Sequence, residues 1–429
     1  MLTRASVQRN PSVEKAKSAG RPACRFCASA LTTTFIDLGM SPLCQTHITT
    51  EQLNQVEQFY PLHAYVCDHC FLVQLEEFVA PSEIFDDYPY LSSYSDSWVE
   101  HARRYTEVMR TRLHLGSHSL VIELASNDGY LLQHFVAANI PVLGVEPAAN
   151  VARIAERKGI RTAVEFFGMD TAAKLKRTFG RPDLLLGNNV LAHVPNINDF
   201  VGGMKLLLKA DGLITMEFPH LMQLIRENQF DTIYHEHFSY LSFLVVERIF
   251  RHHGLRLFDV EELPTHGGSL RIYACHEEDG QQPTTPAVAA LRNKELAQGL
   301  ADLETYGRFE ERVKETKRAI LEFLIAAKRQ GKRIVGYGAP GKGNTLLNYC
   351  GIRTDFLDFT VDRNPLKQGK YTPGTHIPIL APEAIRQARP DYIFILPWNL
   401  KDEIVPSISY VRDWGAKFVV PIPHLSIVD

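Results

Sequence analysis

The strongest constraint on the fold is one local pattern that occurs twice, in residues 120–146 and again in residues 333–362. In each copy an apolar strand is followed by a turn of small residues, a helix and a second strand that ends in an acid, Glu146 or Asp362. This order is the half-unit that holds a nucleoside, because the small turn lets the backbone approach the ligand and the acid receives the ribose hydroxyls. We therefore expect an α/β chain with two Rossmann-like domains.

The turn of the first copy departs from the Gly-x-Gly-x-x-Gly pattern of dinucleotide sites. Ala125 and Asn127 stand where glycines would make room for a pyrophosphate. An acid at the strand end without space for phosphates favours S-adenosylmethionine (SAM) over NAD, and an NAD-binding half-unit is the alternative. Ligands of open parallel sheets lie at the carboxyl ends of the strands, and the later strand 183–187 ends in two asparagines. The candidate cofactor residues are Glu123, Ala125, Asn127, Gly129, Glu146, Asn188 and Asn189.

The turn of the second copy, residues 336–345, holds four glycines and one lysine. Such a turn predicts a phosphate cradle, in which backbone N–H groups and the Lys342 ammonium face an anion. It nearly meets the P-loop pattern, but Gly343 replaces the Mg²⁺-binding Ser or Thr, which disfavours ATP hydrolysis. A glycine-rich turn of purely structural use is the alternative. Two turns of different chemistry predict two different ligands.

Residues 234–240, with the sequence YHEHFSY, are the candidate catalytic stretch. They hold two imidazoles, a carboxylate and two phenols, groups that take or give a proton near neutral pH. If the stretch is extended, His235 and His237 share one face and Tyr234 and Glu236 the other. The zincin spacing His-Glu-x-x-His is absent, so acid–base chemistry is favoured over a metal site. A polar loop that caps a helix is the plain alternative.

Two Cys-x-x-Cys pairs precede the first nucleotide-type unit. Their thiolates, Cys24, Cys27, Cys67 and Cys70, form the tetrahedral set that a structural Zn²⁺ prefers, with no position left for substrate. A redox pair is the alternative for either motif alone, and the presence of two makes it less favoured. The metal is expected to supply much of the folding free energy of so small a segment. Cys44 is expected to be a small buried side chain rather than a further ligand.

Residues 261–274 are strand-like around two adjacent glycines. Paired glycines inside such a run indicate a bulge or a close approach of backbone to ligand, and Arg271 could pair with a phosphate. A tight turn with a surface arginine is an equal alternative. The substrate candidates here are His266, Gly267, Ser269 and Arg271.

The totals narrow the class of protein. A chain of 429 residues is too long for one core, and 46 basic against 49 acidic residues argue against a general nucleic-acid or membrane-surface binder. No apolar run reaches the roughly 20 residues that span a bilayer, and no secretion signal is evident, so we expect a cytoplasmic protein. We expect a tail (1–20), a zinc lobe (21–85), a SAM domain (86–284), a helical connector (285–330) and a second Rossmann-like domain (331–429).

With these motifs assembled, the sequence resembles the SAM-dependent NDP-hexose C-methyltransferases of deoxysugar biosynthesis. The resemblance runs from Cys24 to the C-terminus and rests on the two cysteine pairs, ELASNDGYLL (123–132), NVLAHVP (189–195), YHEHFSY, HGGSLR (266–271) and GYGAPGKGNT (336–345). It implies a zinc lobe, a central SAM domain and a C-terminal Rossmann-like domain that holds the nucleotide-sugar.

The resemblance also implies the reaction and the residues that carry it. The substrate would be a dTDP-4-keto-deoxyhexose, methylated at the carbon next to the ketone, with C3 favoured over C5. His237 would be the general base, Tyr234 and Glu236 would orient or polarise the enolate, and His193 and Tyr88 would lie nearby. The C-terminal substrate residues would be Tyr337, Gly338, Lys342, Gly343, Asn344, Asp362 and Arg363.

Two other classes of protein compete with this interpretation. An NAD-dependent nucleotide-sugar dehydrogenase would use the turn 336–343, with Asp362 on the ribose. A non-catalytic zinc scaffold would bind neither nucleotide. The sequence does not distinguish a monomer from a small homo-oligomer.

Overall fold

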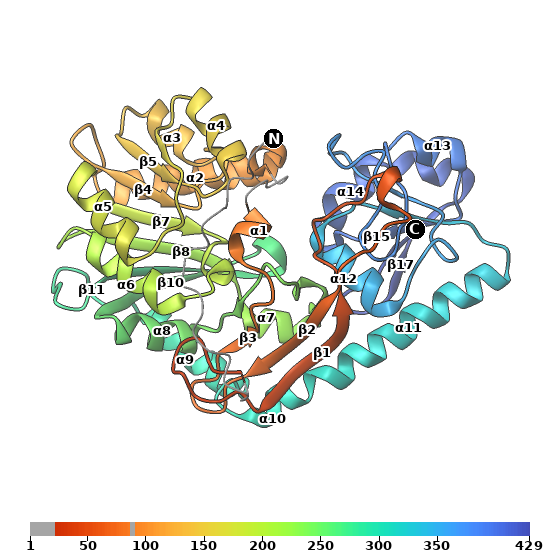
Figure 1. The fold of residues 1–429 in the computed structure, drawn as a ribbon, viewed down its shortest axis with the longest axis horizontal. Helices are drawn as coiled ribbons and strands as arrows, with labels where there is room; N and C mark the ends of the chain where they lie inside the picture. Colours follow the sequence, from red (N-terminus) through yellow and green to blue (C-terminus); the bar gives the residue numbers. More distant parts are fainter. Residues whose placement is uncertain (1–21, 86–90) are drawn as a thin grey trace, which may run out of the picture.

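The computed structural model describes residues 22–85 and 91–429. Its described strands form three sheets, one in each of an N-terminal lobe, a central domain and a C-terminal domain (Figure 1). The predicted α/β class and the two Rossmann-like domains are confirmed. Tyr88 lies outside the described residues. None of the helices in the described ranges is long and apolar enough to cross a membrane.

The N-terminal lobe is built on a four-stranded antiparallel sheet in the order β1-β2-β3-β9. Three strands come from the lobe: β1 (Thr33–Ser41), β2 (Tyr60–Val66) and β3 (Val73–Leu75). The fourth, β9 (Ser239–Tyr240), is the end of the candidate catalytic stretch, and it pairs with β3 through Tyr240 and Ser239. The lobe therefore holds one end of that stretch in its own sheet.

The central domain has a seven-stranded sheet in the order β10-β11-β8-β7-β4-β5-β6. Its parallel strands are β4 (Val121–Leu124), β5 (Val142–Val145), β6 (Thr162–Ala163), β7 (Leu184–Asn188) and β8 (Leu213–Pro219). The antiparallel hairpin β10 (Leu255–Leu263) and β11 (Ser269–His276) extends it. The chain starts at β4 and leaves it on both sides, toward β5 and toward β7. A ligand is expected at such a switch point, outside the carboxyl ends of the strands.

Helices cover both faces of the central sheet, as the nearly continuous apolar strands β4 and β7 require. They are α2 (Asp96–Arg112), α3 (Leu132–Ala137), α4 (Ala149–Arg157), α5 (Met169–Phe179), α6 (Ile197–Leu207) and α8 (Phe243–His252). Short turns of 3-10 helix, η3 (Leu191–His193), η4 (Phe230–Thr232) and η5 (Thr265–Gly267), lie beside the candidate site.

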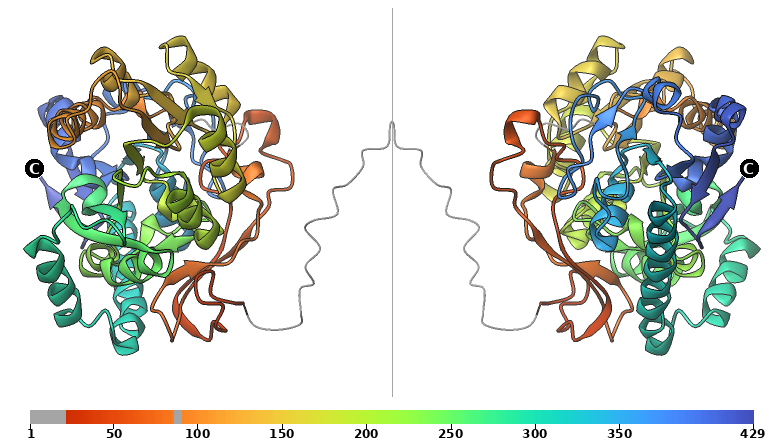
Figure 2. Two further views of the ribbon diagram at one scale, coloured as in Figure 1. Left: turned by 90° about the vertical axis from the view of Figure 1, so that its left-hand side faces the viewer. Right: turned by 90° about the vertical axis from the view of Figure 1, so that its right-hand side faces the viewer.

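Three helices, α9 (Pro286–Ala297), α10 (Leu303–Gly307) and α11 (Phe309–Arg329), make up the predicted connector. Val313, Ile320, Leu324 and Ala327 form the buried stripe of α11, at helical spacing. This helix runs along the outer side of the molecule toward the C-terminal domain (Figures 1 and 2).

The C-terminal domain repeats the theme with a six-stranded sheet in the order β14-β13-β12-β15-β16-β17. Its strands are β12 (Ile334–Tyr337), β13 (Thr360–Val361), β14 (Ile379–Leu380), β15 (Tyr392–Ile395), β16 (Lys417–Val420) and the antiparallel edge strand β17 (Ser426–Val428). Helix α12 (Gly341–Cys350) follows β12 directly.

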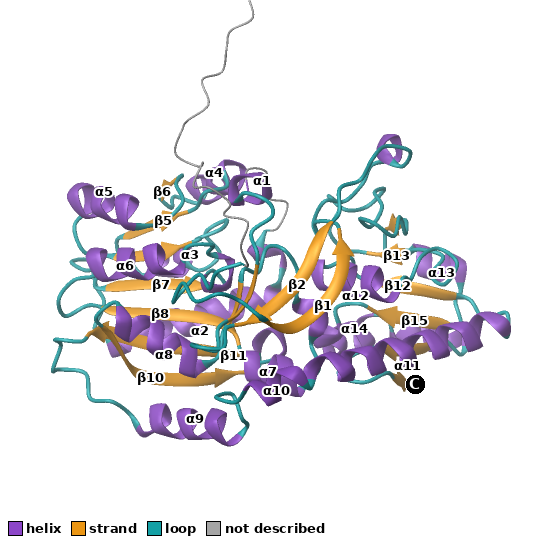
Figure 3. Ribbon diagram, turned by 60° about the horizontal axis from the view of Figure 1, so that its bottom comes forward, coloured by secondary structure: helices purple, strands orange, loops and turns teal. Residues whose placement is uncertain are grey.

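One hydrophobic core joins the N-terminal hairpin to the C-terminal domain. Phe35 and Leu62 of the hairpin belong to the same buried cluster as Val313 of α11 and Ile393 of β15. The hairpin β1–β2 lies between the central and C-terminal sheets (Figure 3). This packing places the segment after β1 against α12 of the C-terminal domain.

Candidate active site

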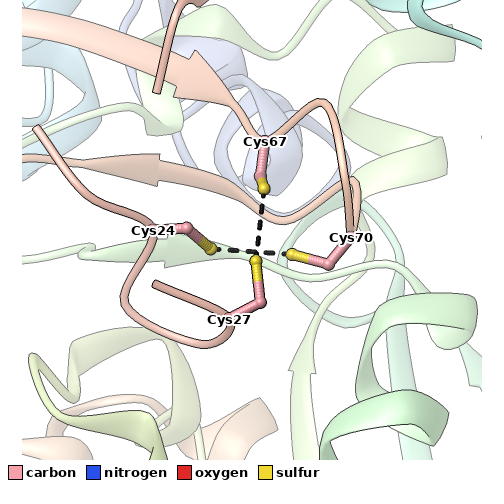
Figure 4. A group of neighbouring side chains, drawn as sticks. All are labelled: Cys24, Cys27, Cys67 and Cys70. Atoms are coloured by element: carbon pink, nitrogen blue, oxygen red, sulfur yellow. Dashed lines mark hydrogen bonds between the residues drawn. The ribbon is translucent and has the colours of Figure 1, made fainter. Parts of the chain in front are cut away.

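The four predicted zinc ligands converge (Figure 4). Their sulfurs all lie within 4.8 Å of one another, with Cys24 and Cys70 3.6 Å apart and Cys27 and Cys67 3.5 Å apart. A tetrahedral Zn²⁺ with Zn–S bonds of about 2.3 Å would set its sulfurs about 3.8 Å apart, so the set fits a structural zinc ion. Gln74 lies in β3, where it pairs with Ser239 of β9, and it donates an N–H to the Cys24 sulfur at 3.2 Å. One residue therefore connects the metal site to the end of the catalytic stretch.

A cavity of about 540 Å³ lies at the switch point of the central sheet. This volume is within the range of small-molecule sites. Of the predicted cofactor residues, five line it: Ala125, Asn127, Glu146, Asn188 and Asn189. His193, predicted as catalytic, lines it as well.

The predicted turn adopts a conformation that glycine usually supplies. Ala125 and Asn127 have φ values of 54° and 48°. The Glu146 carboxylate accepts hydrogen bonds from the backbone N–H groups of Asn127, at 3.0 Å, and Ala148, at 2.9 Å. The acid therefore fixes the turn as well as facing the cavity.

The charges around this turn suit a cationic ligand. Glu123 is fully buried behind it, and within the described part of the chain neither of its carboxylate oxygens has a hydrogen-bond partner. Burial, reinforced by Glu146 and Asp128, raises its pKa well above the usual range. A raised pKa leaves Glu123 uncharged until a cation approaches, so a sulfonium or ammonium group of SAM would favour its ionised form, whereas the diphosphate of NAD would oppose its ionisation. The residues thus fit SAM.

Some residues of the cavity wall were missed from the sequence. Trp98 lines it from α2, and Phe166, Phe167 and Glu165 line it from the segment after β6. An acid soon after a third parallel strand repeats the theme of Glu146, a signal that could have revealed this wall.

The candidate catalytic stretch is a turn over residues 234–237, not the extended strand considered above. The His237 N–H donates to the Tyr234 carbonyl at 2.9 Å, which puts the two rings 4.1 Å apart on one side. His235 points the other way, with Nε2 3.1 Å from the Pro61 carbonyl of the N-terminal lobe. The alternation of faces expected for a strand therefore does not hold, and the two histidines have different surroundings.

His237 has the tautomer of a base. Its Nδ1 lies 2.9 Å from the Thr232 carbonyl oxygen, so Nδ1 carries the proton and Nε2 the lone pair. Burial above all, and then the neighbouring His193, lowers the pKa of His237 well below the usual range. The ring is therefore neutral at neutral pH.

Glu236 faces the segment that follows β1. Its Oε1 lies 3.6 Å from the Cys44 sulfur, and the carboxyl is nearly buried. Burial, and then the Glu236 charge, raises the pKa of the Cys44 thiol well above the usual range, so the thiol keeps its proton. Cys44 is thus buried, as expected, and it contacts the catalytic stretch.

The HGG turn joins the cavity to the C-terminal domain. Asn189 Nδ2 donates to His266 Nε2 at 2.9 Å, and the His266 ring stands edge-on to Trp98 with 4.9 Å between centroids. A Cβ at Gly267 would come within 2.8 Å of the Trp398 ring and of Gln229 Nε2, so glycine permits a close approach to protein here. The neighbours at these glycines are therefore side chains of this chain, whereas the sequence predicted a bulge or a close approach to ligand.

Arg271 differs from the predicted phosphate-binding residue. It is 6% exposed and pairs with Glu217 at 2.6 Å and Glu261 at 3.2 Å, above the Tyr105 ring. Its charge is therefore satisfied inside the central domain. Glu217 also accepts a hydrogen bond from Thr265 at 2.9 Å, which ties the start of the HGG turn to β8. Ser269 donates to the Thr265 carbonyl and is buried within the same turn.

The glycine-rich turn before α12 also differs from the predicted phosphate cradle, because protein fills the space. A Cβ at Gly341 would lie 2.9 Å from the Cys44 sulfur, and Asn344 Nδ2 donates to the Cys44 carbonyl at 2.6 Å. Gly338 and Gly343 permit close packing against Pro397 and Leu396. The first turn of α12 is thus covered by the segment after β1.

Two of the remaining C-terminal candidates, Asp362 and Lys342, have hydrogen-bond partners within the protein. Asp362 accepts from the backbone N–H groups of Ala339 and Asn364, each at 2.8 Å, so its carboxylate braces the turn rather than awaiting a ribose. Tyr337 is buried; burial raises its pKa, and the Ser407 hydrogen bond and then the Arg363 charge oppose that rise. Lys342 instead turns toward the central domain.

Comparison with known proteins agrees with this architecture. Residues 24–85 match a family model described as "Putative zinc binding domain", residues 98–260 a "Methyltransferase domain" and residues 264–423 a "C-methyltransferase C-terminal domain". The chain is similar to the C-methyltransferase NovU of Streptomyces niveus, with 35% identity over 405 residues, 94% of this chain and 96% of the relative.

Solved methyltransferase structures are similar to less than half of the chain. A SAM-dependent methyltransferase from Clostridium acetobutylicum has 12% identity and a TM-score of 0.34, over 42% of this chain and 92% of that one. The magnesium protoporphyrin IX methyltransferase of Synechocystis with bound SAM has 14% identity and a TM-score of 0.31, over 42% and 82%.

A relative with this identity over nearly the full length of both chains, together with the three family matches, establishes the kinship. The chain belongs to the SAM-dependent C-methyltransferases.

Proposed function

We propose that this enzyme methylates the carbon next to the ketone of a dTDP-4-keto-deoxyhexose, C3 in preference to C5, with His237 as the base. The observation that carries the proposal is the placement of His237. Its Nδ1 proton is bound to the Thr232 carbonyl, which leaves the Nε2 lone pair for the substrate, and its ring contacts His193 on the wall of the cofactor cavity.

The chemistry needs a base, an aligned methyl donor and a group that stabilises an oxyanion. SAM supplies a methyl group on a positively charged sulfur that needs no further activation. His237 takes the proton from the carbon next to the ketone, and the electron pair of that C–H bond makes the carbon nucleophilic. Tyr234 and Glu236 orient the ring of the sugar, and His193 stands between the base and the cofactor cavity.

The proposed cofactor residues are those around the first turn and the ends of the strands: Glu123, Ala125, Asn127, Gly129, Glu146, Asn188 and Asn189. The proposed substrate side is the region of the HGG turn and the first turn of α12, which hold His266, Gly267 and Lys342. Tyr88 remains a proposed neighbour of the base.

The dehydrogenase alternative lacks support from either turn. The first turn gathers the acids Glu123, Asp128 and Glu146, which oppose a diphosphate, and the second is filled by Cys44. Both features favour the methyltransferase over an NAD enzyme, and the C-methyltransferase relatives disfavour a scaffold.

The test is a methyl-transfer assay with isotopically labelled SAM and a panel of dTDP-4-keto-deoxyhexoses, read by mass spectrometry. We expect label in a sugar that carries the 4-ketone and none in the 4-hydroxy counterpart, because only the ketone acidifies the neighbouring C–H. Thermal-shift titrations with SAM, S-adenosylhomocysteine and NAD accompany it, and stabilisation by NAD alone would contradict the proposal.

A further inference from the structure

The C-terminal domain places a cationic side chain, Lys342, near the catalytic stretch. Lys342 stands in the first turn of α12, where its Nζ donates to Asn399 Oδ1 at 2.9 Å and lies 4.8 Å from the centre of the Trp398 ring. The Trp398 indole N–H in turn donates to Asp231, a fully buried acid of η4, at 2.7 Å. Lys342 is thus held in one direction by residues of both domains.

The base lies close to this group. The Trp398 ring beside Lys342 donates to Asp231, and the carbonyl of the next residue, Thr232, accepts from His237 Nδ1 at 2.9 Å. After burial, the Lys342 charge is among the causes that lower the pKa of His237 and of His266. The same charge opposes the rise in the pKa of Asp231 that burial causes. Lys342 therefore lies near enough for its charge to act on the two imidazoles and on one acid.

The surroundings of Lys342 do not fit a phosphate site. A phosphate bound at a helix N-terminus uses several backbone N–H groups together with the lysine. At α12 those groups lie beneath Cys44 and Gln45, whose side chains come within 3.3 Å of a Cβ at Gly341. A single ammonium without its amide cradle is suited to a single oxygen rather than to a diphosphate.

We propose that Lys342 is a catalytic residue whose ammonium donates a hydrogen bond to the ketone oxygen of the substrate and stabilises the enolate. The proposal rests on the proposed function. His237 Nε2 takes the proton from carbon, the C–H electron pair forms the carbon–carbon double bond, and the carbonyl pair moves onto the oxygen. Lys342 keeps its proton throughout. Asp231 balances its charge before the oxyanion forms.

Contacts with two other segments of the chain hold α12, and with it Lys342, in place. The segment after β1 covers the end of the C-terminal sheet where a dinucleotide would bind, and its Cys44 carbonyl accepts from Asn344 of α12. On the other side, Thr345 Oγ1 of α12 donates to the Ile233 carbonyl at 3.1 Å, just before the catalytic turn. The C-terminal Rossmann-like domain thereby holds Lys342 near His237 instead of binding a dinucleotide.

The test compares Lys342→Met with Lys401→Met, an exposed lysine at the start of α14 (Lys401–Ser407) in the same domain. Two readouts are used: methyl transfer, and exchange of the proton next to the ketone with deuterated water in the presence of S-adenosylhomocysteine. We expect K342M to slow both by roughly 100- to 1000-fold, as for removal of one oxyanion donor, with KM for the sugar nucleotide changed less than about threefold. K401M is expected to match the wild type.

Results that contradict the proposed role of Lys342 differ from results that contradict the proposed function. A higher KM with unchanged kcat would make Lys342 a diphosphate ligand, and unchanged kinetics would remove it from the site; either overturns the proposal. If wild-type enzyme shows neither exchange nor transfer, the proposed function itself fails. Thermal unfolding and SAM binding are measured for both variants, and Lys342→Gln is the second variant should K342M prove unstable.

Discussion

The rings of His193 and His237 meet edge to face, with 4.6 Å between their centroids and 75° between their planes. His193 lines the cofactor cavity, whereas His237 belongs to the turn after Ile233, whose carbonyl accepts a hydrogen bond from Thr345 of the C-terminal domain. This contact therefore joins the two halves of the proposed reaction, the methyl donor and the base.

Replacement of His237 by Asn is expected to abolish turnover without loss of the cofactor. The variant lacks the Nε2 base, so methyl transfer falls by roughly 100- to 1000-fold, while SAM affinity changes less than about threefold. Calorimetric titration and a steady-state assay measure the two. The matched control is His235→Gln on the same turn, which faces Pro61 instead; it is expected to lower Tm and to keep most of the rate.

The pH dependence follows from the lowered pKa of His237. A base works when it is neutral, and burial keeps this imidazole neutral below the usual value of 6.5. The acid limb of kcat/KM is therefore expected to lie below pH 6.5, with little change between pH 8 and that value. An acid limb centred above pH 6.5 and lost in His237→Asn would contradict this assignment of the pKa.

Removal of zinc is expected to impair catalysis although the metal is remote from the reaction. Gln74 contacts the Cys24 sulfur and pairs in the sheet with Ser239, so loss of the metal loosens the end of the catalytic turn. Cys67→Ser should lose bound zinc, lower Tm and reduce activity. Cys350→Ala, a buried cysteine of α12 outside the cluster, should keep one zinc per chain by metal analysis. Full activity of metal-free protein would refute the link.

Two neighbouring small residues of the cofactor turn should respond in opposite ways. Gly129 has φ 76°, and a Cβ there would lie 2.3 Å from Ile160 Cδ1, so Gly129→Ala is expected to weaken SAM binding at least tenfold. Ala125 already has φ 54°, a conformation that costs a non-glycine residue about 1 kcal/mol. Ala125→Gly should therefore retain SAM binding, and its stability should change by no more than about 1 kcal/mol. Unchanged SAM affinity in Gly129→Ala would mean that the turn does not shape the cofactor site.

The sequence was sufficient to predict the features that depend on residues close together in the chain. The strand, turn and acid of residues 120–146 follow from hydrophobic pattern and small residues, and the four cysteines follow from the spacing of two short motifs. Both kinds of prediction depend on residues that are close together in the chain.

The sequence was insufficient where distant segments meet. Cys44 reaches Glu236 across 192 positions and Asn344 across 300, contacts that depend on how the hairpin packs on the C-terminal core. The phosphate cradle was predicted from the turn alone, which does not reveal that another segment fills it. Arg271 likewise carries no local sign that Glu217, 54 residues earlier, pairs with it.

The most direct test of the central claim is a crystal structure of the enzyme with S-adenosylhomocysteine and a dTDP-4-keto-deoxyhexose. We predict that His237 Nε2 lies within about 3.5 Å of the carbon next to the ketone, on the side of the sugar from which the proton leaves. A His237 ring that points away from the sugar, with a different side chain in contact with that carbon, would contradict the account.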